Sequence, residues 1–319
     1  MKIPGDTGKN WRKNRMVEYI GSFPDEIGPL IRDYFKKQNL SKDDQVWWVL
    51  LYSSCYCMGT ACILQQELDY KSLKKSQAER FWSENKPRLI FQSDRRYIKN
   101  MNQFVEILGE FIHRSKRHPW EYLQQFLRAT PSETYNALYK EVSSWRYYGR
   151  FGTILFLYNL NKLMGIPMDS RDYDWKSGKT TTAAVFNAIY EDDKADAFES
   201  TAFLTTADTE FLNAFLSKLI NRLSTKYPDK TWTVMGVTSD LCSYRKLFKQ
   251  TRYLGYYVDR QQEELIWLQD RWPEYQELWN DFWDGRECYI NSQYLGELNG
   301  YAGIQKDRMR SWVERGEFR

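Results

Sequence analysis

Apolar residues recur at spacings of three and four along most of the chain, the repeat of one face of an α-helix. One such face comprises Ile98, Met101, Val105, Leu108 and Ile112. Asp94 stands before it as a candidate N-terminal cap. The same repeat predicts helices over residues 24–37, 132–145, 211–223 and 261–272. The pattern therefore predicts a mainly α, compact multi-helix fold.

Two stretches depart from this repeat. Residues 230–235 alternate as a strand would, but one short strand does not make a sheet. Residues 46–64 carry no charge over about the length of a membrane span. Because this run contains Ser53, Ser54 and Thr60, we interpret it as a buried core helix and expect no membrane partner.

Breaks in the helical pattern fall at residues 165–180 and near Pro228. Neither is long enough to separate independent domains. We expect a single helical domain over residues 1–319, within which two lobes can meet around residues 145–180.

Composition adds two signals. Aromatic residues reach 17%, with 13 Trp and 23 Tyr, so rings serve either as core bulk or as stacking platforms for bases. The net charge is only +4, yet Lys, Arg and His cluster within residues 2–15, 113–118 and 306–319. Such local clusters suit phosphate contacts, although any one of them is more often a solvated surface.

Several classes of site are disfavoured. Cys55, Cys57 and Cys62 lack zinc-ligand spacing and are predicted to be buried, small hydrophobic residues in a reducing compartment. With only two histidines, a His-based metal site or a Ser-His-Asp triad is not expected. Neither the phosphate-binding loop nor the dinucleotide fingerprint occurs. The polar N-terminus shows no secretory signal.

Three segments could carry chemistry. Residues 145–153 contain two glycines before an apolar helix, the outline of a helix-hairpin-helix DNA element or of an ordinary helical hairpin. The loop with Asp169, Asp172 and Asp174 can bind Mg²⁺, act as a base toward an amine, or be a solvated acidic loop. Residues 242–260 combine a thiol, cations and rings. This mixture suits a site for an anionic, ring-bearing substrate, or an amphipathic helix with a solvated basic face.

These segments resemble the phage α-glutamyl/putrescinyl thymine pyrophosphorylases, or amino acid:DNA transferases. The resemblance rests on residues 145–160, on the Asp-Tyr-Asp-Trp sequence 172–175, and on residues 241–246 and 252–260. It implies a helical fold related to helix-hairpin-helix DNA glycosylases. One departure is Asn159-Leu160, where the family tends to carry Asp-Leu.

The resemblance implies a reaction on double-stranded DNA that carries phosphorylated 5-hydroxymethyluracil. The amine of an amino acid or polyamine would replace the phosphate or pyrophosphate, in the cytoplasm of an infected cell and with no cofactor beyond a possible Mg²⁺. Asp172 and Asp174 would serve the amine, and Cys242 could add to the uracil ring. Substrate binding is assigned to Arg146, Tyr148, Arg150, Trp175, Tyr244, Lys246, Arg252, Tyr253, Asp259 and Arg260.

Three alternatives stay open on the sequence. The chain could be a helix-hairpin-helix glycosylase-like enzyme that excises a modified base. It could bind DNA without catalysis, through its basic and aromatic surface alone. It could also be a helical interaction protein that never meets nucleic acid.

Overall fold

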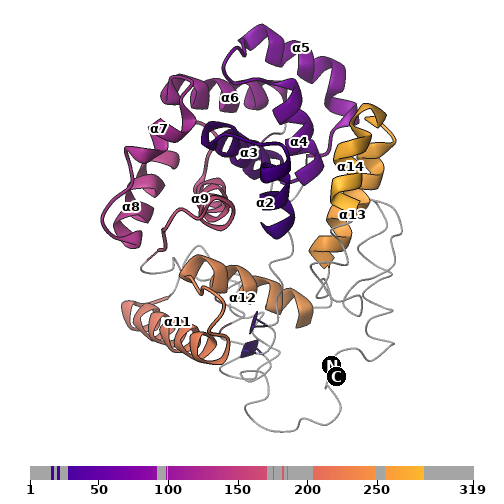
Figure 1. Ribbon diagram of the computed structural model, residues 1–319. Coiled ribbons are helices and arrows are strands. Elements are labelled where there is room, and N and C mark those ends of the chain that lie inside the picture. The colour runs from indigo at the N-terminus through magenta and orange to yellow at the C-terminus, as the bar shows by residue number, and fades with distance from the viewer. Residues whose placement is uncertain are drawn as a thin grey trace, which may run out of the picture.

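The computed structural model describes residues 16, 17, 20, 21, 28–91, 98, 100–170, 175, 182, 185, 204–248 and 256–283. All regular secondary structure in these ranges is helical (Figure 1). The α-helices are α2 (Gly28–Lys37), α3 (Lys42–Cys55), α4 (Met58–Glu67), α5 (Lys75–Asn85), α6 (Met101–Ser115), α7 (Pro119–Gln124), α8 (Pro131–Val142), α9 (Arg150–Met164), α11 (Thr206–Lys226), α12 (Val234–Phe248), α13 (Tyr256–Gln269) and α14 (Gln276–Trp283). Two short 3₁₀ helices are also present in the described ranges: η1 (Lys86–Arg88) follows α5, and η4 (Pro273–Tyr275) precedes α14. The expected all-α class is confirmed.

Helix α3 forms the centre of the larger hydrophobic core. It is apolar on every side, and each residue from Val46 to Cys55 is buried, as expected for a helix surrounded by protein. Its N-terminus is fixed by a capping box between Ser41 and Asp44. Around it pack α4, α7 and α9, while α5 and α6 pair beside them (Figure 1).

A second, smaller core forms around α11 and α12. Leucines at helical spacing on α11 meet Val237, Leu241 and Tyr244 of α12. Met16, Val17 and Ile20 from the start of the chain join this cluster. Helix α12 also contacts α9 of the larger core, so the two cores adjoin along these helices (Figure 1).

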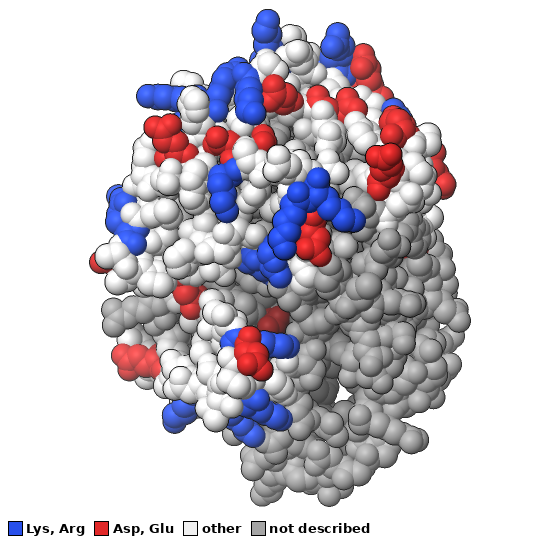
Figure 2. All heavy atoms as spheres, viewed as in Figure 1, with Lys and Arg blue, Asp and Glu red and all other residues white. Residues whose placement is uncertain are grey.

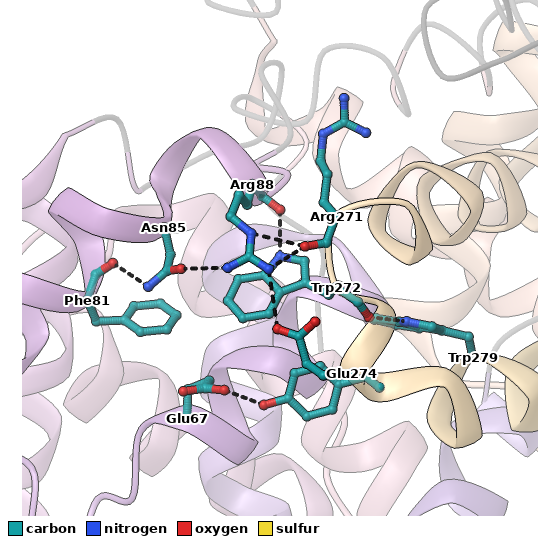
Figure 3. Close-up of polar contacts among 9 residues, drawn as sticks. Glu67, Phe81, Asn85, Arg88, Arg271, Trp272, Glu274 and Trp279 are labelled. Atoms are coloured by element: carbon teal, nitrogen blue, oxygen red, sulfur yellow. Dashed lines mark hydrogen bonds and ion pairs between the residues drawn. The ribbon is translucent and has the colours of Figure 1, made fainter.

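After the second core the chain returns to the first. Helices α13 and α14 pack beside α4. Arg88, the last residue of η1, contacts the segment between these two helices (Figure 3). The Arg88 guanidinium lies 3.8 Å from the centre of the Trp272 ring and donates to the Arg271 carbonyl and to Glu274. Trp272 Nε1 donates back to the Arg88 carbonyl at 2.8 Å. In sequence, helices α11 and α12 of the smaller core therefore lie between two parts of the larger one.

Two sequence predictions are corrected here. Residues 230–235 form no strand, because 231–233 lack regular structure and α12 begins at Val234. The uncharged run 46–64 is two buried helices, broken where Tyr56 adopts a left-handed conformation with φ of 55°. None of the described helices is long and apolar enough to cross a membrane.

Helix boundaries also shift. The helix predicted around residues 98–112 begins at Met101, and its cap is Asn100, which accepts a bond from Gln103 N at 3.0 Å. Asp94, the expected cap, lies outside the described residues. Helix α8 ends at Val142 rather than at Trp145.

Candidate active site

A groove of about 890 Å³ lies where the two cores meet. One wall comes from the larger core, from α2, the end of α3 and successive turns of α9. The other wall is the segment 229–243, which leads into α12. Gln261 of α13 also lines it. Segments far apart in the sequence thus form one cavity of a size that suits a small substrate.

The groove is rich in positive charge. Arg32, Arg150, Lys162 and Lys230 line it, against Asp229 and Asp240. Arg32 donates to the Lys162 carbonyl at 3.0 Å, which holds two of these cations on neighbouring helices. Several cations around one cavity favour an anionic ligand such as a phosphate or a carboxylate.

Aromatic rings make up much of the remaining wall. Tyr52, Tyr56, Phe151, Tyr158 and Trp232 line the groove. The Lys162 ammonium donates to the Tyr158 hydroxyl at 3.1 Å. Cations and rings in one cavity are the combination that a negatively charged nucleotide requires.

The N-terminus of α9 adds a further positive feature to this wall. Its N-cap is Gly149, which supplies no side chain to satisfy the first amides. Arg150 and Phe151, the first two residues of the helix, line the groove. An uncapped N-terminus carries partial positive charge from its amides and the helix dipole. The dipole and Arg150 therefore act in the same direction.

The N-terminus of α12 is instead capped from a distant segment. Asp169 accepts bonds from Val234 N at 2.8 Å and Met235 N at 3.2 Å. Burial raises the pKa of Asp169, although these amide bonds oppose the shift. Of the three carboxylates in the loop suggested by the sequence, this one has a structural role.

The comparisons with known proteins agree with this geometry. A model of the amino acid:DNA transferase family matches residues 25–253. The chain belongs to this family. A protein named serinyltransferase from Salmonella phage ViI is 23% identical over 295 residues, covering 85% of this chain and 70% of that protein. No solved structure matches the chain significantly. The resemblance seen in the sequence is confirmed, and the protein is a DNA-modifying transferase.

Two of the residues proposed from the sequence line the transferase groove, Arg150 and Cys242. Cys242 is half-buried on α12, with Ser243 and Asp240 beside it in the lining. The other described cysteines, Cys55, Cys57 and Cys62, are fully buried as predicted, and burial raises the pKa of each thiol. Cys242 is thus the described thiol best placed to meet a substrate.

Three proposed substrate-binding rings pack inside the transferase instead. Tyr148 is buried in the larger core, where its hydroxyl lies 2.8 Å from Ser54 Oγ. Trp175 and Tyr244 are buried in the smaller core, and Trp175 Nε1 donates to Asn213 at 2.6 Å. None of the three is among the groove-lining residues.

The charged residues proposed from the sequence are more scattered. Arg146 is exposed and pairs with Glu106 of α6 at 2.9 Å, away from the groove lining. Asp259 is buried on α13, and Arg260 pairs with buried Glu264 at 3.0 Å. The remaining candidates, Asp172, Asp174, Arg252, Tyr253 and the side chain of Lys246, lie outside the described part of the chain.

One of the three basic clusters is used within the fold. Arg114 pairs with Glu110 at 2.7 Å and with Glu141 at 2.8 Å. Arg117 donates to the carbonyls of Tyr70 and Leu73. On the face in Figure 2, acidic atoms are interspersed among the basic ones over the upper helices, and basic atoms gather near α2. The two terminal clusters lie outside the described residues.

Several groove residues were missed by sequence reasoning. None of Arg32, Lys162 and Lys230 was singled out from the sequence as a site residue, and Tyr56 was placed inside one continuous helix. Asn159 was noted only as a departure from the family pattern, yet it lines the groove and is bound to Ser53 at 3.1 Å. Arg32 and Lys162 gave no signal, because single charges on helices are common. No group of three potential metal ligands occurs among the described residues.

Proposed function

We propose that the protein joins an amino acid to the C5-methylene carbon of phosphorylated 5-hydroxymethyluracil in double-stranded DNA. The observation that carries this proposal is the groove itself, whose described lining combines four cations, several rings and Cys242 in a member of the amino acid:DNA transferase family. Cations suit the phosphorylated leaving group, and rings suit the base.

The reaction exchanges one bond for another. The C–O bond between the methylene carbon and the phosphate or pyrophosphate breaks, and its electron pair leaves with the phosphate. The donor ammonium gives up a proton, and its nitrogen forms the new C–N bond. Arg150 and the N-terminus of α9 would stabilise the negative charge that builds on the departing oxygen.

The balance of charge favours an amino acid over a polyamine as donor. Among the described residues, four cations and two carboxylates line the groove. An amino acid brings a carboxylate that such cations can hold, whereas a polyamine brings only positive charge, which they repel. The name of the related phage protein makes serine the first donor to test. Asp172 and Asp174 remain the proposed bases for the donor amine.

Two chemical routes lead to the product. The Cys242 thiolate could add to C6 of the uracil, expel the leaving group to give an exocyclic methylene, and depart after the amine adds to it. Alternatively the amine displaces the phosphate directly, with Cys242 serving as part of the wall. Both routes use the same groove and the same leaving-group contacts.

Mass spectrometry of nucleosides tests the proposal. A duplex with phosphorylated 5-hydroxymethyluracil is incubated with the protein and with serine, other amino acids or putrescine in separate reactions. We expect a new nucleoside whose mass is that of the amine adduct, and none from the unphosphorylated duplex. Release of free base with abasic sites would instead indicate a glycosylase, and no product with any donor would overturn the proposal.

A further inference from the structure

Three rings on α3 and at its C-terminus form a stacked series that leads from the larger core to the groove. Trp48 and Tyr52 have centroids 5.1 Å apart and planes inclined by 24°. Tyr52 and Tyr56 have centroids 5.8 Å apart and planes inclined by 18°. Trp48 and Tyr52 are buried, whereas Tyr56 is half-buried, and both tyrosines line the groove. The series therefore reaches the candidate site.

The backbone at Tyr56 is unusual for an aromatic residue. Tyr56 is the C-cap of α3, with φ of 55° and ψ of 32°, and its N–H donates to the Tyr52 carbonyl. Glycine or asparagine adopts this left-handed conformation far more readily than tyrosine does. A side chain that the backbone disfavours, placed at a groove, points to a function for that side chain.

We propose that the Tyr56 ring is the platform on which the target pyrimidine stacks once it is turned out of the duplex. This inference deepens the proposed function and rests on DNA being the substrate. An enzyme that acts on an atom of a base must take that base out of the stack, and an aromatic face replaces the contacts that the base loses. Trp48 and Tyr52 support Tyr56 from behind, so its ring plane is set before the base arrives.

The platform also orients the reacting carbon. A pyrimidine stacked on Tyr56 lies in the groove that Arg150 and Cys242 line from two other helices. Its plane is then fixed: one face lies on Tyr56, and its edge and its opposite face can meet the cations and the thiol. Tyr56 thus acts as a substrate-binding residue, distinct from the groups that act on the leaving oxygen.

The left-handed backbone makes a clean test available. Tyr56→Asn removes the ring but suits the conformation, so relief of the left-handed backbone offsets part of the packing lost against Tyr52, and the protein should still fold. Tyr56→Phe keeps the ring without the hydroxyl. Lys116→Asn is the matched control, because Lys116 is a left-handed C-cap of α6 with φ of 48° and does not line the groove.

The first measurement is steady-state transfer of serine to the phosphorylated duplex. We expect Tyr56→Asn to lower kcat/KM for DNA by about tenfold to a hundredfold, the loss of one base–ring stack, with little change in KM for serine. Tyr56→Phe and Lys116→Asn should stay close to the wild type. Equal losses in Tyr56→Phe and Tyr56→Asn, or none in Tyr56→Asn, would overturn the platform.

A binding measurement separates this inference from the proposed function. Affinity is compared for two duplexes that differ only in whether the target nucleotide carries its phosphorylated base or is abasic. We expect the wild type and Tyr56→Phe to prefer the duplex with the base, and Tyr56→Asn to lose that preference. A preference that survives in Tyr56→Asn sinks the platform whether or not transfer occurs, whereas wild-type protein that shows the preference without making product counts against the transfer reaction alone.

Discussion

Replacing Asp169 by alanine should loosen the start of α12. In the folded protein the carboxylate accepts the amides of Val234 and Met235, the first two residues of that helix. Loss of an N-terminal cap costs about 1 kcal/mol, and up to about 2 kcal/mol where the helix end is well packed. For a chain of this size, that loss corresponds to a fall in Tm of roughly 1.5–3 °C.

Two control variants sharpen the result. Asp169→Asn keeps one oxygen acceptor for the amides and removes the negative charge. Burial disfavours that charge, as the raised pKa of Asp169 shows, so the Tm of this variant should lie between those of the wild type and the alanine variant. Asp208→Ala removes the capping box of α11, which does not line the groove. It should lower Tm without lowering turnover in the folded protein, whereas Asp169→Ala should lower both because α12 carries Cys242.

The assay is thermal unfolding followed by circular dichroism, with transfer rates measured well below the transition. An Asp169→Ala protein that melts with the wild type would refute the capping argument. If that variant also bound DNA but made no product, the carboxylate would belong to the chemistry, as the acidic loop first suggested.

Four further outcomes are expected. Arg150→Ala should lower the transfer rate well beyond any loss of DNA affinity, whereas Arg146→Ala, which removes an exposed ion pair, should leave the rate nearly unchanged. Cys242→Ser should abolish turnover if the thiol adds to the base, and retained turnover with no trapped adduct in the wild type excludes that route. Burial raises the pKa of Glu141, but hydrogen bonds from Tyr122, Trp145 and Arg114 outweigh burial and hold the pKa below the usual 4.5. The ionised carboxylate therefore stabilises the fold above that pH, and this contribution is lost as the pH falls through the lowered pKa. Glu141→Gln should lower stability at neutral pH, and acid denaturation curves should show the variant and the wild type converging at low pH. The logarithm of the DNA affinity should fall linearly with the logarithm of the salt concentration, with a slope that corresponds to only a few neutralised phosphates. A salt-independent affinity would contradict a cationic groove.

The sequence was informative about helices because their signal is local. The apolar faces of α6 and α11 repeat within each helix, and their positions were predicted to within a few residues. The start of α12 was not, because the Asp169 carboxylate that caps it lies 65 residues away. The short alternation before Val234 therefore suggested a strand.

The site was predicted less well for a related reason. Aromatic and basic residues mark both cores and binding surfaces, and nothing local separates Tyr148, which packs inside, from Phe151, which borders the groove. The left-handed conformation falls on Tyr56 itself, and neither glycine nor asparagine, the usual sequence signals for it, stands at that position. Arg150 and Cys242 were identified because they stand in segments with several kinds of chemical group, which a core helix does not need.

The Arg88 contact has a consequence for how the chain folds as it is made. Arg88 bonds the carbonyl of Arg271, 183 residues later, and Trp272 bonds back to the Arg88 carbonyl. Closing so long a loop costs conformational entropy before the contacts at its ends stabilise the fold, and proteins dominated by such distant contacts fold slowly. On the ribosome, the larger core must wait for α13 and α14, whereas the smaller core, whose last residues lie on α12, can already form. Until then the faces of α4 and η1 that these helices cover stay exposed, and nascent chains stalled before residue 271 should depend most on chaperones.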